Sequence, residues 1–307
     1  VAHGGGAGPG TVGQAAMAVA TGQCRAAVIW RARKRSAAAS RVWAQTSPVL
    51  SDHWKWSRPS GLLRPADEVA MLPRRYMHEH GDVSDALCEI ALALRAYACR
   101  NPLATMHGKP MTRDDYYASR MIADPLRLFD NCLETDGAVA LVLVPAQRAK
   151  AAGQCPVVIE AFAQGMAPGH QQMADFHRAD PLSSCGRVAA EKLWSMTPLG
   201  PGDVDVAQIY DAFSPLLLFS LEAYGFTPKG TAAQFITEGG IRLDGKLPCN
   251  TAGGSLSEAY LHGLNHVTEA VRQLRGSAAT QVADARVALV TGCAVTPHGA
   301  LLLRRAA

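Results

Sequence analysis

Large aromatic side chains and long apolar runs are both scarce in this chain of 307 residues. Phe, Trp and Tyr make up 6% of the residues, so we expect the core to rely on close packing of small residues. The longest apolar runs, such as 139–144 and 216–219, are far shorter than the ~20 residues that cross a bilayer. Residues 1–10 are rich in glycine and do not resemble an apolar signal segment. We therefore expect a soluble, cytoplasmic protein with no membrane contact.

Closely spaced cysteine pairs are also missing. The eight cysteines are scattered, and no two of them form a C-x-x-C pair. This argues against a zinc ribbon or a thioredoxin-like redox site within the chain. We expect reduced thiols that are mostly small buried side chains, and no metal site.

A strong net charge is absent as well. The chain has 30 Lys and Arg against 26 Asp and Glu, a formal net charge of +4, which gives no argument for nucleic-acid binding. Its 48% hydrophobic and 18% charged residues are typical of a folded protein. One local basic run consists of Arg31, Arg33, Lys34, Arg35 and Arg41. It is either a solvated loop or an anion-binding surface, for example for the phosphates of a bulky cofactor.

Helical and strand patterns alternate along the chain, which predicts an α/β fold with two similar halves, residues 1–150 and 151–307. Ser84 and Thr112 are expected N-caps. Long loops are expected over 44–65 and 226–247. The expected helices cover 11–21, 65–79, 84–101, 112–119, 181–195, 214–224 and a long helix from the turn at 250–254 through 274. The expected strands cover 24–30, 136–145, 157–163, 206–210, 286–291 and 300–304.

The start of the chain lacks a strand before its first turn. Residues 1–10 form a glycine-rich turn of the kind that follows a strand, and a helix and a strand come next. The order of turn, helix and strand predicts that a first strand has been cut off. We therefore expect the sequence to be a fragment, or one that starts too late.

Two glycine motifs in this region suggest other functions. Gly8-Pro-Gly-Thr-Val-Gly13 matches the dinucleotide-binding pattern G-x-G-x-x-G, but no strand precedes it. His3-Gly-Gly-Gly6 resembles the oxyanion loop of lipase-like hydrolases. Those enzymes also need a G-x-S-x-G elbow, and Gly253-Gly-Ser-Leu-Ser257 lacks its last glycine. Neither interpretation is favoured.

The most informative segment runs from Asn250 to His266. The glycine turn Asn250-Thr-Ala-Gly-Gly254 leads toward a helix, and its backbone N–H groups can approach a thioester or a phosphate closely. Tyr260 and His262 are expected near the head of this helix. The alternative is a capped helix with a structural core tyrosine.

Several motifs, in this order along the chain, resemble the thiolase-like superfamily and above all its sterol-carrier or lipid-transfer branch. Residues 109–112 and 125–139 match the middle of that branch. Val206-Ala-Gln-Ile-Tyr-Asp-Ala-Phe-Ser214 resembles its second motif, Asn250-Thr-Ala-Gly-Gly254 its glycine turn, and Thr291-Gly-Cys-Ala-Val-Thr-Pro-His-Gly299 its last, cysteine-containing loop. The resemblance implies a thiolase-like fold with α-β-α-β-α layers. It also implies that about eighty N-terminal residues, with the first strands, are missing.

The catalytic residues depart from the thiolase pattern. Gly5 stands at the position of the nucleophilic cysteine and has no side chain to carry an acyl group. Tyr260 replaces the histidine that activates this cysteine, and Tyr210 replaces the Asn or His of the second motif. This combination resembles the steroid side-chain-cleaving aldolases of actinobacteria. It implies retro-aldol cleavage of a β-hydroxyacyl-CoA steroid, with release of propionyl-CoA and a ring ketone.

Retro-aldol cleavage needs a group that takes the hydroxyl proton, donors that hold the enolate oxygen, and an acid for the α-carbon. Tyr210 and Tyr260 are the predicted catalytic residues, with exchangeable roles. His262 and Cys293 are secondary candidates, the latter because thiolases keep a base at its position. The expected substrate-binding residues are His3, which could line the pocket, Gly5 on the nucleophile loop, and Asn250, Gly253 and Gly254, which would shape the turn under the thioester.

The resemblance implies an acyl-CoA substrate, a homodimer and a small OB-fold partner protein that bears a zinc ribbon. Coenzyme A is expected only as part of the substrate, with no further cofactor. Two alternatives stay open. The first is an acyl-CoA acyltransferase or thiolase, against which Gly5 argues. The second is a non-catalytic lipid- or acyl-CoA-binding subunit, or an inactive fragment.

Overall fold

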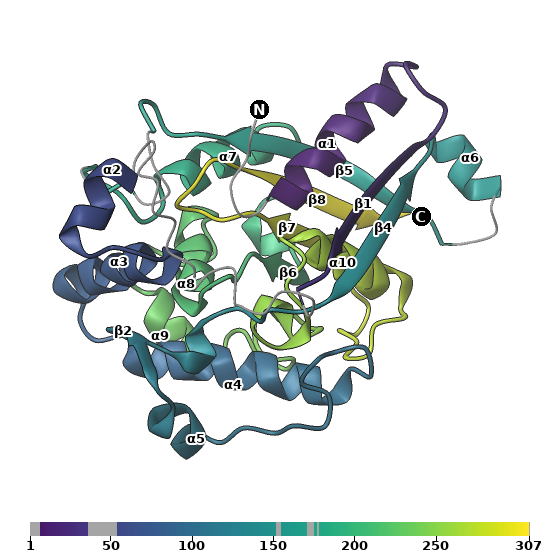
Figure 1. The fold of residues 1–307 in the computed structure, drawn as a ribbon. Helices are drawn as coiled ribbons and strands as arrows, with labels where there is room; N and C mark the ends of the chain where they lie inside the picture. Colours follow the sequence, from purple (N-terminus) through teal and green to yellow (C-terminus); the bar gives the residue numbers. More distant parts are fainter. Residues whose placement is uncertain (1–6, 36–53, 152–154, 171–174, 177, 307) are drawn as a thin grey trace.

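The computed structural model describes residues 7–35, 54–151, 155–170, 175–176 and 178–306. At its centre is a sheet with the strand order β5-β8-β7-β6 (Figure 1). β6 and β7 are parallel, and the other neighbouring pairs are antiparallel. β6 and β7 are buried along their whole length, as expected where both faces of a sheet are covered. The strands are β5 (Val157–Gly165), β6 (Val206–Ile209), β7 (Val287–Thr291) and β8 (His298–Arg305).

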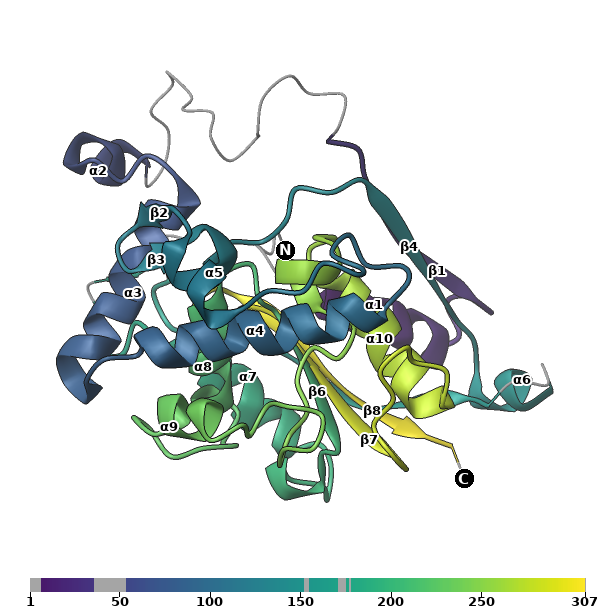
Figure 2. The ribbon, with the colours of Figure 1, turned by 90° about the horizontal axis from the view of Figure 1, so that it is seen from below.

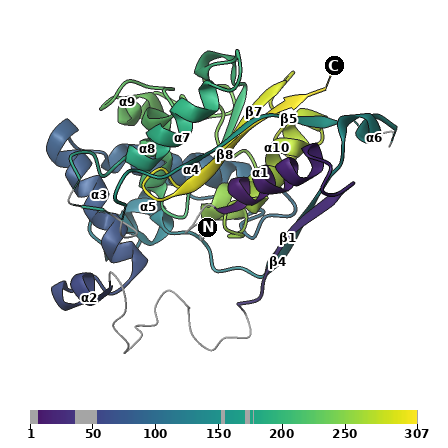
Figure 3. The same ribbon diagram turned by 90° about the horizontal axis from the view of Figure 1, so that it is seen from above.

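Helices cover both faces of this sheet. α1 (Ala7–Ala20) and α10 (Leu264–Arg275) pack on one face, and α7 (Ser184–Trp194) packs on the other with α8 (Ser214–Ala223) beside it (Figure 3). α10 ends at Gly276, whose φ of +71° suits a left-handed helix cap. The predicted α/β fold is confirmed. The division at residue 150 stays a prediction, and α1 packs directly on β5 and β8.

A second sheet lies on the outer side of α1 and α10 and contains β1 (Ala27–Arg33) and β4 (Gly137–Leu143) (Figure 2). The strands are antiparallel, and Ala27 pairs with Leu143. Because side chains alternate along a strand, Ile29 points into the core whereas Val28 and Trp30 lie on the exposed face. The layers of the described residues are therefore sheet, helices, sheet and helices.

A long insertion between β1 and β4 covers one side of the molecule. Its helix α4 packs on α8, on α9 (Ala232–Thr237) and on the turn at Gly254–Glu258 (Figure 2). The Thr112 side chain accepts a hydrogen bond from the backbone N–H of Asp115, which confirms it as a helix cap. The insertion contains α2 (Trp54–Ser57), α3 (Pro65–His80), α4 (Ser84–Arg100), α5 (Arg113–Ala118), β2 (Met121–Ala123) and β3 (Leu126–Arg127), and α6 (Ala146–Ala151) follows β4.

Some expected elements are wrong. Ser84 is not a cap: α4 begins after Val83, and the Ser84 hydroxyl donates to Asp82. The long helix through residue 274 is interrupted, because positive φ angles at His262 (+54°) and Gly263 (+82°) cannot continue a helix. Before this break, the expected helix forms only the single turn Gly254–Glu258.

The two long loops that the sequence predicts contain helices. Within 226–247, α9 forms where Ala232 and Ile236 are buried against its neighbours. Within 44–65, α2 forms, whereas 44–53 lie outside the described residues. No helix of the described part of the chain is long and apolar enough to cross a membrane.

Candidate active site

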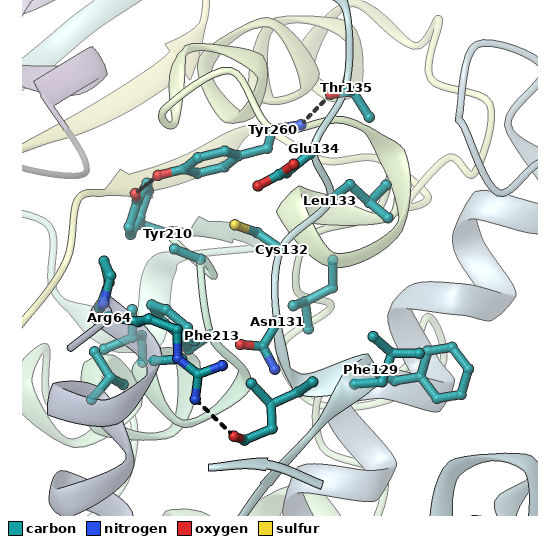
Figure 4. A pocket seen from close by; sticks show the side chains of 18 of the residues that line it. Arg64, Phe129, Asn131, Cys132, Leu133, Glu134, Thr135, Tyr210, Phe213 and Tyr260 are labelled. Atoms are coloured by element: carbon teal, nitrogen blue, oxygen red, sulfur yellow. Dashed lines mark hydrogen bonds between the residues drawn. The ribbon is translucent and has the colours of Figure 1, made fainter. Parts of the chain in front are cut away.

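A cavity of about 610 Å³ lies between the insertion and the edge of the central sheet (Figure 4). Its volume is in the usual range for ligand pockets. It reaches from exposed Thr105 and Arg120 to buried Tyr210 and Tyr260. Much of its wall is apolar, with Leu128, Phe129, Leu133, Ala212, Phe213, Leu216, Leu256 and Val295. Such a cavity suits a largely apolar ligand with a polar end at the mouth.

The two predicted catalytic tyrosines meet in this cavity. Their phenol oxygens are 2.6 Å apart, and the side chains are 2% (Tyr210) and 3% (Tyr260) exposed. Tyr210 directly follows β6, and Tyr260 lies in the turn before α10. The prediction that both tyrosines face one pocket is confirmed (Figure 4). Their roles in catalysis stay a prediction.

Burial raises the pKa of both phenols, so both are protonated at neutral pH. Two contacts favour ionisation of Tyr260 over that of Tyr210. The hydrogen bond from Tyr210 lowers the pKa of Tyr260, and so does the Arg35 guanidinium, which lies 5.4 Å from the centre of the Tyr260 ring. If one phenol gives up a proton, Tyr260 is therefore the better donor.

Asn250 fixes the chain next to Tyr210. Its side-chain oxygen accepts from the backbone N–H of Ile209 at 2.6 Å, and its amide donates to the Ile209 carbonyl at 2.8 Å. The residue is fully buried and has a φ of +53°. It does not line the cavity, and its role in the structure is to support the end of β6.

The glycine turn also supports the site from outside the cavity. The φ angles of Gly253 and Gly254 are +109° and +59°, and neither residue lines the cavity. The Asp211 carboxylate accepts from the backbone N–H of Ser255 at 2.8 Å and lies 3.0 Å from the buried His266 ring. The turn is therefore fastened to the residue that follows Tyr210. The structure thus connects the chain segments that carry the two tyrosines.

His262 supports the ring of Tyr260 and does not line the cavity. The two ring centres are 4.7 Å apart, and the His262 nitrogens lie 2.6 Å from Arg31 and 2.8 Å from Arg33. Burial and the arginines Arg31, Arg33 and Arg35 lower the pKa of His262 to about 3. The imidazole is therefore neutral at physiological pH, and its placement does not support the secondary catalytic role expected for it.

The same contacts correct the interpretation of the basic run. Arg31 and Arg33 belong to β1 and point inward to His262, and Arg35 is buried. For these three residues, the interpretation as a solvated loop is wrong. Arg41 lies outside the described residues, as do His3 and Gly5.

Two cysteines line the cavity, Cys293 and Cys132. Burial raises the pKa of the Cys293 thiol to about 11 and also raises that of Cys132. Both are therefore neutral thiols near pH 7, and neither is a ready nucleophile. Cys132 was not expected from the sequence.

Glu134 is a second cavity residue that the sequence analysis missed. It lies in an extended segment before β4, two residues after Cys132, and both side chains point toward the tyrosines (Figure 4). Both residues fall within the matched segment 125–139, which is the one signal that could have drawn attention to them. Among the described residues, no group of three or more His, Cys, Asp or Glu is arranged to hold a metal ion.

Known proteins resemble this chain in sequence and in structure. The family "Thiolase C-terminal domain-like" matches residues 167–303. The 17-hydroxy-3-oxo-4-pregnene-20-carboxyl-CoA lyase of Mycobacterium tuberculosis is 45% identical, over 98% of this chain and 80% of the lyase. The steroid side-chain-cleaving aldolase of Thermomonospora curvata is 40% identical, over 99% of this chain and 79% of the aldolase.

Solved structures give a consistent result. A structure named "Ltp2-ChsH2(DUF35) aldolase" has a TM-score of 0.92 and 39% identity, and the match covers 98% of this chain and 78% of that chain. An SCP2-thiolase-like protein of Mycobacterium smegmatis has a TM-score of 0.72 over 99% of this chain and 61% of that chain. Its identity of 16% shows a shared fold alone.

Proposed function

This chain belongs to the steroid side-chain-cleaving aldolases of the thiolase-like superfamily, and from this membership we propose the reaction that it catalyses. The reaction is retro-aldol cleavage of a β-hydroxyacyl-CoA that carries a steroid, and the products are propionyl-CoA and a steroid ketone. The preferred substrate is of the class in the name of the lyase relative, a 17-hydroxy steroid with a carboxyl-CoA side chain.

The cleavage needs no covalent intermediate. The proton of the β-hydroxyl leaves, the C–O bond becomes the ketone C=O, and the bond between the α- and β-carbons breaks. Its electron pair forms the enolate of the thioester, which then takes a proton at the α-carbon to give propionyl-CoA. One proton is released and one is taken up, so no oxidant or further reactant is required.

The observation that carries this proposal is the pair of neutral phenols in an apolar cavity. Hydrogen-bond donors in a water-poor site stabilise a developing enolate far more than they would in water. We assign the donor and acid role to Tyr260, because Tyr210 and Arg35 stabilise its anion. The hydrogen bond between the phenols raises the pKa of Tyr210 and lowers that of Tyr260, so we take Tyr210 as the donor of the pair.

Thiolase or acyltransferase chemistry is the weaker candidate. It needs a thiolate at the reacting carbon. Gly5 stands at the nucleophile position of the sequence motif, and the cavity cysteines Cys132 and Cys293 have raised pKa values. The non-catalytic alternative gives no account of why two buried phenols should converge in an open cavity.

The cavity also suits the two ends of such a substrate. The apolar wall, with Phe129, Phe213 and Leu216, offers contact area for a steroid skeleton. Arg120 and Arg64 lie on the same cavity, and guanidinium groups are well suited to phosphate oxygens. We assign the coenzyme A phosphates to the side of the cavity that these arginines line. Coenzyme A enters as part of the substrate, and no other cofactor has a role in the reaction.

The solved relative is named as an assembly of Ltp2 with ChsH2(DUF35). On that basis we propose that this chain also works with a small partner of the OB-fold and zinc-ribbon type, and that the chain itself dimerises. Co-expression with a DUF35-type protein should give a complex that survives size-exclusion chromatography. A chain that is fully active without any partner would contradict this part of the proposal.

The reaction itself is tested with this chain and its partner. A tertiary β-hydroxyacyl-CoA steroid should yield a ketone and propionyl-CoA in equal amounts. Liquid chromatography with mass spectrometry measures both products. Acetoacetyl-CoA with free coenzyme A should give no thiolysis. Thiolysis without ketone release would show that the chain is a thiolase.

A further inference from the structure

One arginine of the cavity wall is buried without a carboxylate to neutralise it. Arg95 belongs to α4, lines the cavity and is 7% exposed. Its contacts within the described part of the chain are all uncharged. They are the Ser257 hydroxyl at 3.2 Å, the Lys109 backbone carbonyl at 3.4 Å and the Phe129 ring, whose centre lies 5.3 Å from the guanidinium carbon. Burial of a charge without such compensation is costly, so this site is incomplete in the absence of a ligand.

The guanidinium of Arg95 has donors to spare. Its five N–H groups make only two hydrogen bonds, one from Nε to Ser257 and a long one from Nη1 to Lys109. The Nη2 atom has no hydrogen-bond partner among the described residues, and it is not one of the unpaired atoms that the protein seals from solvent. Because Arg95 lines the cavity, Nη2 is open to a ligand there.

The other two arginines of the cavity lie closer to solvent. The Arg64 side chain is 37% exposed, and it is paired with Asp67 at 2.6 Å. Arg120 is exposed at the mouth. Phosphates keep much of their hydration, so they suit this outer pair of arginines and not the buried Arg95. Arg95 is therefore available to a different part of the ligand.

The position of Arg95 indicates which part that is. Its guanidinium lies over Phe129, an aromatic residue of the apolar wall, and Phe129 is well separated from Tyr210 and Tyr260 (Figure 4). An apolar skeleton on this wall can satisfy the guanidinium only through an oxygen of its own. A carbonyl oxygen has two acceptor sites and no net charge, so its burial costs far less than that of a phosphate.

We propose that Arg95 binds a ring carbonyl oxygen of the steroid and thereby selects ketosteroids among steroid acyl-CoA substrates. This proposal deepens the proposed function and rests on it for the steroid. Nη2 donates to the carbonyl oxygen, and no covalent bond changes. A steroid without this carbonyl would cover the guanidinium and leave it unpaired, which is the usual origin of strong discrimination between two similar substrates.

The test measures binding apart from turnover. Two steroid acyl-CoA thioesters without the β-hydroxyl, which cannot undergo retro-aldol cleavage, serve as probes. They differ only in that one has a ring ketone and the other has a CH₂ group in its place. Calorimetric titration of the chain in its complex should show about 10–100-fold tighter binding of the ketone, the usual value of a hydrogen bond to a charged group.

Arg95→Met should remove this preference. The side chain keeps its length but has no donor, so the two thioesters should bind within threefold of each other, and free coenzyme A should bind as it does to wild type. Arg127→Met is the matched control. Arg127 also donates to backbone carbonyls, those of Tyr117 and Ser119, and lies over the Tyr117 ring, but it does not line the cavity. It should keep the full preference, and thermal melting checks that both variants fold.

Four results would overturn the proposal. Equal binding of the two thioesters to wild type does so without any variant. A preference that survives in Arg95→Met would assign the carbonyl to another residue. Weaker binding of free coenzyme A to Arg95→Met would place Arg95 on the coenzyme A side, and an equal loss in Arg127→Met would show that the effect is not local to the cavity. If the preference depends on Arg95 but the β-hydroxy thioester releases no ketone product, only the proposed reaction fails.

Discussion

At the scale of single residues, the two cavity tyrosines have different surroundings. The side of Tyr260 carries Arg35 and His262, whereas Tyr210 is held at the end of β6. Tyr260 can therefore carry transient negative charge better than Tyr210. This asymmetry makes the roles of the two hydroxyls separable by experiment.

Removal of either hydroxyl should affect turnover far more than stability. We expect Tyr260→Phe to lower turnover by ~10²–10⁴-fold, and Tyr210→Phe to lower it less, because it acts through Tyr260. Each loss of a hydrogen bond should cost about 1 kcal/mol of unfolding free energy. The measurements are ketone release and thermal melting for each variant.

Tyr97→Phe is the matched control for both tyrosine variants. The Tyr97 hydroxyl is also buried and donates to the Ile241 carbonyl, but it lies outside the cavity. It should lose a similar amount of stability and keep full turnover. Near wild-type turnover in both cavity variants would contradict the assigned roles.

His262 should make the folded protein sensitive to acid. Its pKa is about 3 in the folded state and about 6.5 in the unfolded chain, so between these values only the unfolded state binds the proton. Stability is therefore complete above pH 6.5 and falls as the pH drops. From pH 7 to pH 5 the loss should be about 1–2 kcal/mol, with partial exposure favouring the lower figure.

This effect is measured as a difference between wild type and His262→Gln in urea unfolding at pH 7 and pH 5. The difference is needed because Glu258 acts in the opposite sense. Burial raises its pKa to about 7, so it stabilises the fold as the pH falls. Glu258 is present in both proteins, and its contribution cancels. An identical pH dependence in both would show that His262 does not carry the effect.

At the scale of elements, the glycine turn determines whether the two tyrosines meet. A Cβ atom at Gly254 would lie 2.1 Å from the Asp211 carboxylate, and its φ of +59° disfavours other residues. We expect Gly254→Ala to cost ~2–4 kcal/mol of unfolding free energy and to lower turnover. Thermal melting and ketone release are again the measurements.

Gly276→Ala separates the clash from the backbone strain. Gly276 also has a positive φ, +71°, but a Cβ atom there would meet nothing within 4 Å. It should cost only ~1–2 kcal/mol and leave turnover unchanged. Equal losses in the two variants would mean that contact with Asp211 contributes nothing.

Sequence patterns predicted most of the helices and strands, the two tyrosines and the glycine turn, but not every residue of the cavity wall. Tyr210 and Tyr260 were found because they replace residues in recognisable motifs. Glu134 was missed as a cavity residue because it lies in an irregular segment, and only the tertiary fold brings it to the cavity that Tyr260 lines. The helix break at His262 and Gly263 has one sequence signal, the glycine, because a positive φ at a residue other than glycine is set by its contacts. α9 has six residues, too few for a clear helical period.

At the scale of the whole molecule, the outer side of the β1–β4 sheet is an exposed apolar surface. Val28, Trp30 and Val142 are 65%, 69% and 67% exposed. Val28 pairs with Val142, and Trp30 pairs with Ala140, so they form one continuous patch. Contiguous apolar surfaces promote association, whereas isolated exposed side chains do not.

Trp30→Lys should therefore weaken self-association, so that the protein stays dispersed up to a higher concentration. Leu103→Lys is the control, because Leu103 is 72% exposed but lies outside the patch, and it adds the same charge. Static light scattering over a concentration series measures the association of both variants. An equal improvement in both would attribute the effect to net charge alone.

The pairing of β1 with β4 also bears on how the reaction could diversify. The insertion that these strands bracket supplies Glu134 and the apolar Phe129, whereas the tyrosines come from the two segments joined by the glycine turn. Exchange of the insertion could change the sterol accepted while the tyrosines remain in place.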